Sequence, residues 1–168
     1  MQSAMGVGDE NPQDNVIIAV MRRYLYSVDA RDSSLLTSCF SEQATAVFND
    51  TTEARFELHG NHAIATRLLQ VVSNFASSCH GIANCAVRRL GALEADLDTF
   101  VTAHILAGDR VSSRGLRYRD RLIKEGGAWR ISSRVHTPLW QFDNPAVACA
   151  IPGLAELSQA MPSPDPSR

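Results

Sequence analysis

The second half of the chain contains four strand-like segments in succession, with turns between them and no helix. These segments span residues 79–90, 99–107, 114–124 and 128–140. Turns are indicated within residues 91–98, at Gly108-Asp109 and at residues 125–127. Strands joined directly by short turns pair in antiparallel fashion, so the pattern predicts a four-stranded antiparallel meander.

Two helices are indicated at the start of the chain. Asn11-Pro12 is a typical helix start, and apolar residues then recur at three- and four-residue steps as far as Val28. We expect this helix to end at Asp29, and Asp32 to cap a short second helix.

An early hairpin and a third helix follow. Residues 44–49 and 54–59 alternate like strands around a turn at residues 49–52, and Gly60-Asn61 opens the helix. The order of elements predicts an α+β fold, a cone-shaped barrel in which a curved antiparallel sheet wraps on the N-terminal helices. A curved sheet closed by helices leaves an internal pocket for a ligand.

The length and the position of the prolines suggest how the chain is divided. We expect a single domain over residues 11–142, preceded by a flexible N-terminus over residues 1–10. Residues 143–168 form a Pro-rich C-terminal extension whose end we expect to be disordered. Within it, residues 151–160 could pack as a short helix.

The charge and hydropathy of the chain exclude some partners. A net charge of −2 argues against nucleic acid, because no face collects enough Lys and Arg to follow phosphates. The arginines of the third strand of the meander are expected on a solvated or interfacial sheet face: Arg114, Arg117, Arg119 and Arg121. No apolar run approaches the ~18 residues of a membrane span, and residues 1–10 lack the pattern of a signal peptide.

The four cysteines do not form a recognisable metal site. Cys39, Cys79, Cys85 and Cys149 lack CxxC spacing. Cys79 and Cys85 are expected on the same face of one strand, too far apart for a disulfide within it. We therefore expect four reduced thiols in a cytoplasmic protein.

The segment Ser78 to Val87 places a titratable ring on a strand. Two-residue alternation predicts one face with His80, Ile82, Asn84 and Ala86. A histidine among such small and apolar residues is either a core histidine with a satisfied hydrogen bond or a catalytic base.

Four short patterns, in the order found here, are similar to those of one family. They are YLYSVDARD at residues 24–32, HGIAN at residues 80–84, GLRYRD at residues 115–120 and GAWRISSR at residues 127–134. With the order of elements, they resemble the SnoaL-like family of the nuclear transport factor 2-like superfamily over most of residues 12–142. This superfamily hosts many reactions and also proteins that are not enzymes.

The resemblance implies a set of catalytic residues. Scytalone dehydratase, hexachlorocyclohexane dehydrochlorinase and bile-acid 7α-dehydratase, which are members of the superfamily, pair an aspartate at the end of the first helix with a histidine on the first long strand. The matching residues here are Asp29 and His80. Tyr24 matches a tyrosine of bile-acid 7α-dehydratase, and His104 lies at or next to the second histidine of scytalone dehydratase. These enzymes need no metal or organic cofactor, so we expect none here.

Some positions depart from the scytalone dehydratase pattern. The tyrosine before the aspartate is Val28 here, and the serine and asparagine of a later strand correspond to Leu116 and Tyr118. A scytalone-like substrate is therefore not expected.

An aspartate hydrogen-bonded to one ring nitrogen of a histidine selects the tautomer and raises the basicity of the other nitrogen. If the fold joins Asp29 to His80, such a pair can remove a proton from carbon next to a carbonyl or a leaving group. His104 could protonate a leaving hydroxyl, or be a buried histidine bonded to backbone. Tyr24 could bind an oxygen, or pack where helix and sheet meet.

Further side chains are candidates for contact with the substrate. They are Tyr118, Asn84, Phe48, Phe56, Phe75 and Phe100. His136 could line the rim of the pocket or a subunit interface, whereas His59 and His62 flank a turn and are expected in solvent.

Three functions therefore remain open. The first is a cofactor-independent lyase or isomerase (dehydratase or polyketide-cyclase-like) that acts on a hydrophobic cyclic small molecule. The second is a non-catalytic scaffold, as in the β subunit of ring-hydroxylating dioxygenases, and the third is a ligand-binding module without turnover. Sheet-to-sheet pairing in members of this fold leads us to expect a homodimer or homotrimer.

Overall fold

A computed structural model describes residues 12–50 and 54–147 of the chain. The expectations for residues 1–11, including the Asn11 cap, for the tip of the first turn and for residues 148–168 lie outside the described residues. In the described part, no helix is both long enough and apolar enough to cross a membrane.

Three helices form at the predicted places: α1 (Pro12–Asp29), α2 (Ser33–Ser38) and α3 (Asn61–Val72). The carboxylate of Asp32 accepts a hydrogen bond from the Leu35 backbone N–H at 2.8 Å, which confirms the predicted cap of α2. Gly60 precedes α3 with a φ of 85°, a backbone conformation that favours glycine.

Six strands form one sheet. They are β1 (Phe40–Asn49), β2 (Arg55–His59), β3 (Ser77–Arg89), β4 (Glu94–Ala107), β5 (Arg110–Glu125) and β6 (Ala128–Pro145). Their order is β2-β1-β6-β5-β4-β3, so the predicted hairpin and meander are both present. The two are joined by a parallel pairing of β1 with β6, which the pattern of turns had not indicated.

The strands extend beyond their predicted bounds. β4 begins at Glu94, inside the segment expected to be a turn, and β5 begins at Arg110. β6 continues to Pro145, although we expected regular structure to end near Phe142. The end of β6 is exposed on both faces, so the alternation that marks a strand is lost there, whereas buried residues alternate in β4 from Ala95 onward.

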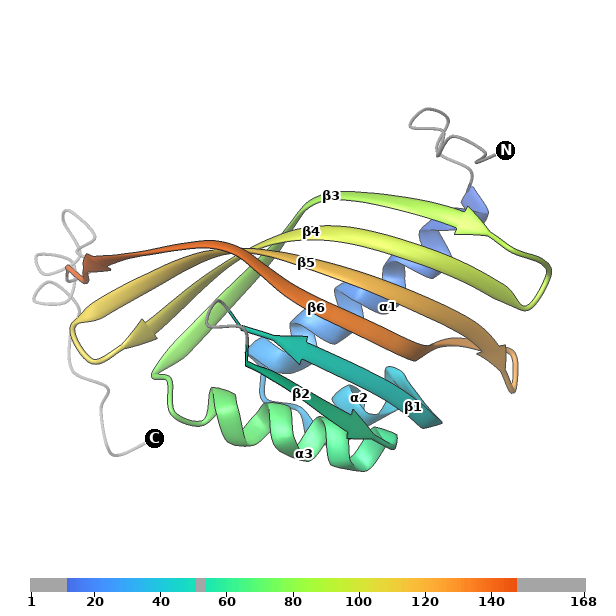
Figure 1. Ribbon diagram of the computed structural model, residues 1–168, viewed down its shortest axis with the longest axis horizontal. Helices are drawn as coiled ribbons and strands as arrows, with labels where there is room; N and C mark the ends of the chain where they lie inside the picture. The colour runs from blue at the N-terminus through green and yellow to red at the C-terminus, as the bar shows by residue number, and fades with distance from the viewer. Residues whose placement is uncertain (1–11, 51–53, 148–168) are drawn as a thin grey trace, which may run out of the picture.

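The sheet curves around the helices. Figure 1 shows the long strands β3 to β6 crossing α1, with α3 beside the short strands β1 and β2. The core lies between these layers and includes Ile17 and Met21 from α1 and Leu97, Leu122 and Ile131 from the sheet. Irregularities in the strand pairing, of the kind that bends sheets, occur in the β3–β4, β5–β6 and β1–β6 pairs.

The irregularity in β3 corrects the predicted alternation. His80 and Ile82 pair with Ala103 and Val101, but the next paired residue is Asn84. The extra residue, Ala83, reverses the faces of the residues after it in the strand. Asn84 therefore shares the outer face, not the face of His80, and Cys79 and Cys85 lie on opposite faces.

A buried ion pair links β5 to β6. The Nε and Nη2 atoms of Arg134 donate to the two carboxylate oxygens of Asp120 at 2.8 and 2.7 Å, and neither side chain is exposed to solvent. The guanidinium lies 3.9 Å from the ring centroid of Tyr24 and 4.6 Å from that of Tyr118. Two of the family-like patterns in the sequence thus meet, since Asp120 ends one and Arg134 ends the other.

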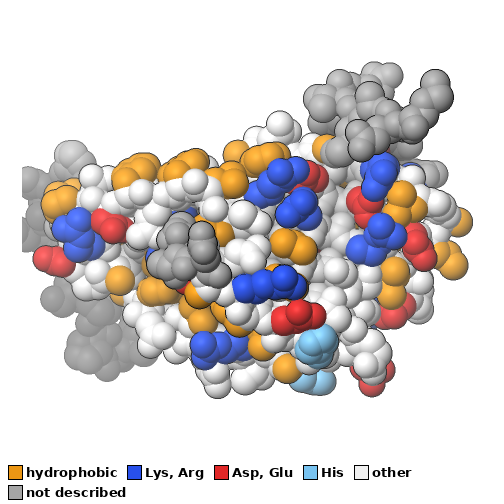
Figure 2. Space-filling view, viewed as in Figure 1, with side chains coloured by type: hydrophobic (Ala, Val, Ile, Leu, Met, Phe, Trp, Pro, Cys, Tyr) orange, Lys and Arg blue, Asp and Glu red, His pale blue; other side chains and the backbone are white. Residues whose placement is uncertain are grey.

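The outer face of the sheet carries paired charges. Arg117 donates to Asp98 at 2.9 Å, and Arg121 donates to Asp96 at 2.6 Å. Figure 2 shows Lys or Arg side chains lying next to Asp or Glu side chains on this face. The prediction of a solvated or interfacial face fits these arginines and the exposed Arg119, but not Arg114, which pairs with Ala103 on the inner face.

Replacement of Asp120 by Asn should strongly destabilise the protein. The substitution leaves the Arg134 cation buried without its carboxylate, so the free energy of unfolding should fall by about 3 kcal/mol or more. Chemical denaturation measures the loss. Asp98→Asn is the matched control, because its partner Arg117 is 37% exposed and a loss below about 1 kcal/mol is expected. Equal losses in the two variants would contradict a special role for the buried pair.

Candidate active site

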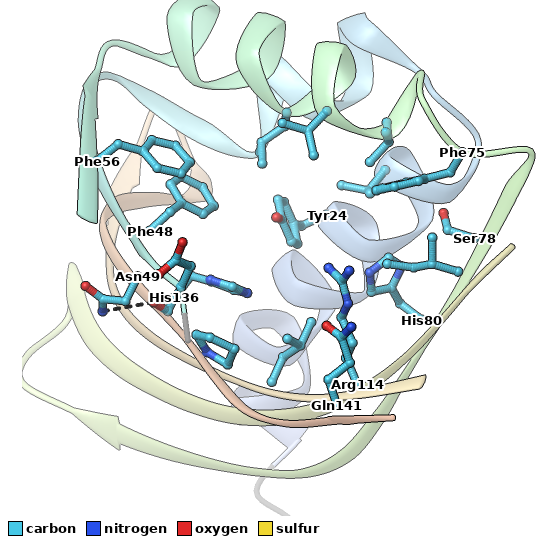
Figure 3. Close-up of a pocket in the computed structure, with 18 of the residues that line it drawn as sticks. Tyr24, Phe48, Asn49, Phe56, Phe75, Ser78, His80, Arg114, His136 and Gln141 are labelled. Carbon is cyan, nitrogen blue, oxygen red and sulfur yellow. Dashed lines mark hydrogen bonds between the residues drawn. The ribbon is translucent and has the colours of Figure 1, made fainter. Parts of the chain in front are cut away.

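A cavity of about 400 Å³ lies between the concave side of the sheet and helices α1 and α3. Most of its wall is apolar and comes from Val28, Phe48, Phe56, Leu68, Val71, Val72, Phe75, Ile105, Leu116, Pro138 and Trp140. The polar lining residues are Tyr24, Asn49, Asp50, Ser78, His80, Arg114, His136 and Gln141. Figure 3 shows several of these side chains projecting into the same space.

Asp29 and His80, which are 51 residues apart, meet at the wall of this cavity. His80 Nδ1 lies 2.7 Å from Asp29 Oδ1, and the His80 backbone N–H donates to Oδ2 at 2.9 Å. The Ser78 hydroxyl also donates to Oδ1, at 2.6 Å. These contacts hold the carboxylate in one orientation against the ring.

Arg31 explains why the end of α1 lies against the start of β3. It follows α1 with a φ of 55°, a left-handed conformation. Its guanidinium donates to the carbonyl oxygens of Phe75 at 2.5 Å and Ala76 at 3.4 Å. These hydrogen bonds hold the segment before β3 against Arg31, which lies two residues after Asp29.

The electrostatics of the pair select one tautomer of His80. Burial raises the pKa of the Asp29 carboxyl, but the hydrogen bonds from Ser78 and His80 outweigh it and lower the pKa below its ordinary value. Asp29 is therefore a carboxylate at neutral pH and can only accept a hydrogen bond. The proton of the neutral ring must then reside on Nδ1, which leaves Nε2 as the basic nitrogen.

Tyr24 lines the cavity, whereas Tyr118 is buried and is not among the lining residues. The two rings meet edge to face with centroids 5.8 Å apart. Burial raises the pKa of the Tyr24 hydroxyl, and burial and the neighbouring Tyr24 raise the pKa of Tyr118 well above its usual range. Both phenols therefore keep their protons at neutral pH, but only Tyr24 is among the residues that line the cavity.

Three of the predicted aromatic contacts lie in the wall: Phe48, Phe56 and Phe75. Phe48 stacks on Phe56 with ring centroids 5.0 Å apart. The two remaining candidates, Phe100 and Asn84, pair with each other across β3 and β4 on the outer face, so they do not contact the cavity.

His104 is not brought together with Asp29 and His80. It is exposed on the outer face of β4, where its Nδ1 lies 2.9 Å from the Ser113 hydroxyl. Its cross-strand neighbour in β3 is Cys79, whereas His80 pairs with Ala103. Because adjacent residues of a strand face opposite sides, the residue that shares a face with His80 is Ala103 and not His104.

His136 was expected at the rim or at an interface, yet it lines the cavity. Its ring packs against Phe48 and Tyr118, and its Nδ1 is buried without a hydrogen-bond partner among the described residues. Burial and the nearby Arg134 lower its pKa to about 4. The strand register sets this position, because His136 lies directly opposite Tyr118, a predicted substrate contact, and therefore shares its face.

Arg114 and Gln141 also line the cavity and were missed. They pair with each other across β5 and β6. The sequence-based prediction groups Arg114 with Arg117, Arg119 and Arg121. Residues three positions apart on a strand lie on opposite faces, however, so Arg114 does not share the face of Arg117. A strict two-residue count from Tyr118, a predicted substrate contact on the same strand, would have placed Arg114 on the same face as Tyr118.

The described residues offer little for metal binding. Within residues 12–50 and 54–147, no three His, Cys, Asp or Glu side chains are grouped closely enough to hold a metal ion. Cys39 is a buried free thiol and Cys79 is an exposed one. Cys149 lies outside the described residues.

The tautomer of His80 can be tested directly by ¹⁵N NMR. In the wild type, the neutral ring should carry its proton on Nδ1, because Asp29 accepts it there. Asp29→Leu removes the acceptor and should shift the neutral ring toward the Nε2-protonated form. His104 serves as the internal control, since its environment does not include Asp29. An Nε2-protonated His80 in the wild type would contradict the assignment of Nε2 as the base.

His136 should make stability depend on pH in the acidic range. Its pKa of about 4 lies below the ordinary 6.5. Between these two pH values, His136 is protonated in the unfolded chain but neutral in the folded protein. Stability is then lost as the pH falls from 6.5 toward 4, by up to about 3 kcal/mol. Denaturation of His136→Phe across this range should show a shallower loss than the wild type. The exposed His59, replaced by Gln, should leave the profile unchanged. If His136→Phe does so too, another group is responsible.

Comparisons with known proteins agree with this architecture. Residues 13–135 match the family model of the SnoaL-like domain. No curated protein sequence gives a significant match. A candidate scytalone dehydratase from Novosphingobium aromaticivorans is similar in structure, with a TM-score of 0.70 and 19% identity over 84% of this chain and 94% of that one.

Two further solved structures are similar. One is the type 3 hexachlorocyclohexane dehydrochlorinase from Novosphingobium barchaimii, with a TM-score of 0.70 and 15% identity over 84% of this chain and 96% of that one. The other is a candidate aromatic ring hydroxylase from Novosphingobium aromaticivorans, with a TM-score of 0.69 and 19% identity over 81% and 96% of the two chains. These identities establish a shared fold and no more. The match over residues 13–135, together with this fold, shows that the chain belongs to the SnoaL-like family.

Proposed function

We propose that this protein is a cofactor-independent lyase that acts on a hydrophobic, ring-bearing small molecule. The observation that carries the proposal is the 2.7 Å contact between Asp29 and His80 at the wall of an apolar cavity. Dehydration is the preferred reaction. Double-bond isomerisation and ring closure begin with the same removal of a proton from carbon, so they fit the same residues.

His80 is the general base in this proposal. Its side chain is only 8% exposed, so bulk water does not compete freely for Nε2. When Nε2 takes a proton from the substrate carbon, the ring becomes an imidazolium, and the Asp29 carboxylate at Nδ1 stabilises that positive charge. Ser78 keeps the carboxylate oriented and is a positioning residue.

Dehydration follows from one further proton transfer. Removal of a proton next to a carbonyl group gives an enolate, and expulsion of the hydroxyl on the neighbouring carbon then forms a double bond. The proton held on Nε2 can pass to the departing hydroxide, which leaves as water and restores the neutral base. The hydroxyl of Tyr24, which stays neutral, can donate a hydrogen bond to an oxygen of the substrate in the same cavity.

The cavity limits the substrate to compact apolar molecules. Its volume of about 400 Å³ lies toward the small end of ligand sites. The stacked Phe48 and Phe56 rings and the aliphatic side chains of α3 offer contact to a flat ring. They also exclude water, which strengthens electrostatic interactions around His80.

The proposal can be tested with hydroxylated bicyclic ketones. One suitable compound is 3-hydroxy-1-tetralone, whose loss of water yields fluorescent 1-naphthol. Deuterium exchange next to the carbonyl of 1-tetralone, followed by NMR in D₂O, reports proton removal when no group leaves. With an active compound, Asp29→Asn and His80→Gln should each reduce kcat/KM by about 10²- to 10⁴-fold.

His104→Gln is the matched control, because this histidine lies on the outer face, and its activity should stay within about twofold of the wild type. Full activity in His80→Gln would overturn the assignment of the base. If neither water loss nor exchange occurs with any member of the panel, a ligand-binding or scaffold function becomes the better explanation of the cavity.

A further inference from the structure

Arg114 occupies an unusual place in the cavity. Strand register aligns four inner-face residues in one row across the sheet: His80 on β3, Ala103 on β4, Arg114 on β5 and Gln141 on β6. Neighbouring strands lie about 4.8 Å apart, so the backbones at His80 and Arg114 are roughly 10 Å apart. His80, the proposed base, and the Arg114 cation therefore lie on either side of Ala103, a small residue.

Ala103 separates the two long side chains in this row. It is fully buried, and its methyl group is the smallest side chain that this row could carry apart from glycine. The two long side chains beside it, His80 and Arg114, both line the cavity. Figure 3 shows Arg114 and His80 directed toward the same region of the cavity.

No carboxylate among the described residues neutralises the charge of Arg114. Its Nε donates to the Ser112 hydroxyl at 3.3 Å, and no carboxylate within the described ranges forms an ion pair with it. Two other arginines of the sheet differ in this respect, since Arg117 pairs with Asp98 and Arg134 with Asp120.

Other titratable groups in the cavity do not supply the missing anion. Asp50 also lines it, but its Oδ1 accepts the Ala54 backbone N–H at 2.9 Å within the β1–β2 turn. His136 is held neutral by burial and by nearby positive charge, that of Arg114 included. An unneutralised guanidinium in a mostly apolar cavity attracts an anion far more strongly than it would in water.

We propose that Arg114 binds a carboxylate of the substrate, which makes the substrate class a ring-bearing carboxylic acid. The side-chain amide of Gln141, next to Arg114 in the row, can donate a further hydrogen bond to the same group. With the carboxylate held there, the ring of the acid lies in the cavity and presents its carbon atoms to His80. The inference rests on the proposed function for its chemistry, but it concerns binding and can be tested without turnover.

A pair of unreactive probes separates charge from shape. 2-Naphthoate and 2-naphthamide have the same ring and nearly the same size, and only the first is an anion at neutral pH. Isothermal titration should give a Kd for 2-naphthoate at least about tenfold below that for the amide, as expected for a charge-assisted, bidentate contact. Perturbation of the His80 ¹⁵N signals by 2-naphthoate checks that it binds in this cavity.

Substitutions test whether the charge of Arg114 is responsible for the preference for the anion. Arg114→Gln should remove the preference for the anion while leaving the affinity for 2-naphthamide within about twofold. Arg114→Lys should retain part of the preference, because the charge remains but the planar fork is lost. The matched control is Arg117→Gln on the outer face of the same strand, which should bind both probes as the wild type does.

Several results would overturn the inference. They are equal affinity of the wild type for the two probes, no binding of 2-naphthoate at millimolar concentration, or an anion preference that survives in Arg114→Gln. The proposed lyase function fails separately, through loss of the His80-dependent activity. A protein that prefers 2-naphthoate but never removes a proton would keep the carboxylate site and lose the reaction.

Discussion

The buried ion pair between Asp120 and Arg134 is the interaction on which the rest of the structure depends. A guanidinium cut off from water must keep a carboxylate beside it, because the unpaired charge would cost several kcal/mol. The pair therefore holds β5 and β6 in one register. The rings of Tyr24, Phe40 and Tyr118 surround the cation, so α1 and β1 are drawn onto the same point of the sheet.

Helix α1 connects this structural centre to the candidate chemistry. Tyr24 packs on Arg134, and five residues later the helix ends at Asp29, whose carboxylate holds His80. Since one rigid helix carries both side chains, the position of α1 on the sheet also sets the position of the carboxylate against the base. Arg31 secures the other side of this junction through the carbonyl oxygens that lead into β3.

The inner face of β5 shows how one strand serves both stability and binding. Asp120 lies in the core, where its charge is neutralised by Arg134. Six residues earlier, Arg114 lines the cavity without such a partner among the described residues. A charge paired inside the protein contributes to the fold, whereas a charge left unpaired in a cavity is available to a ligand.

The sequence by itself determined what depends on local chemistry: the helix ends at Asp29 and Asp32, the turns, the succession of strands and, through the family resemblance, the pairing of Asp29 with His80. It did not determine which strand face each side chain occupies. The extra residue in β3 turned Asn84 outward, and β4 directed Ala103 inward in place of His104. Arg114 and His136 entered the cavity because pairing across β4, β5 and β6 assigns the faces. Alternation along a strand shows which residues share a face but not which face is the inner one. Only tertiary pairing decides which side faces the helices.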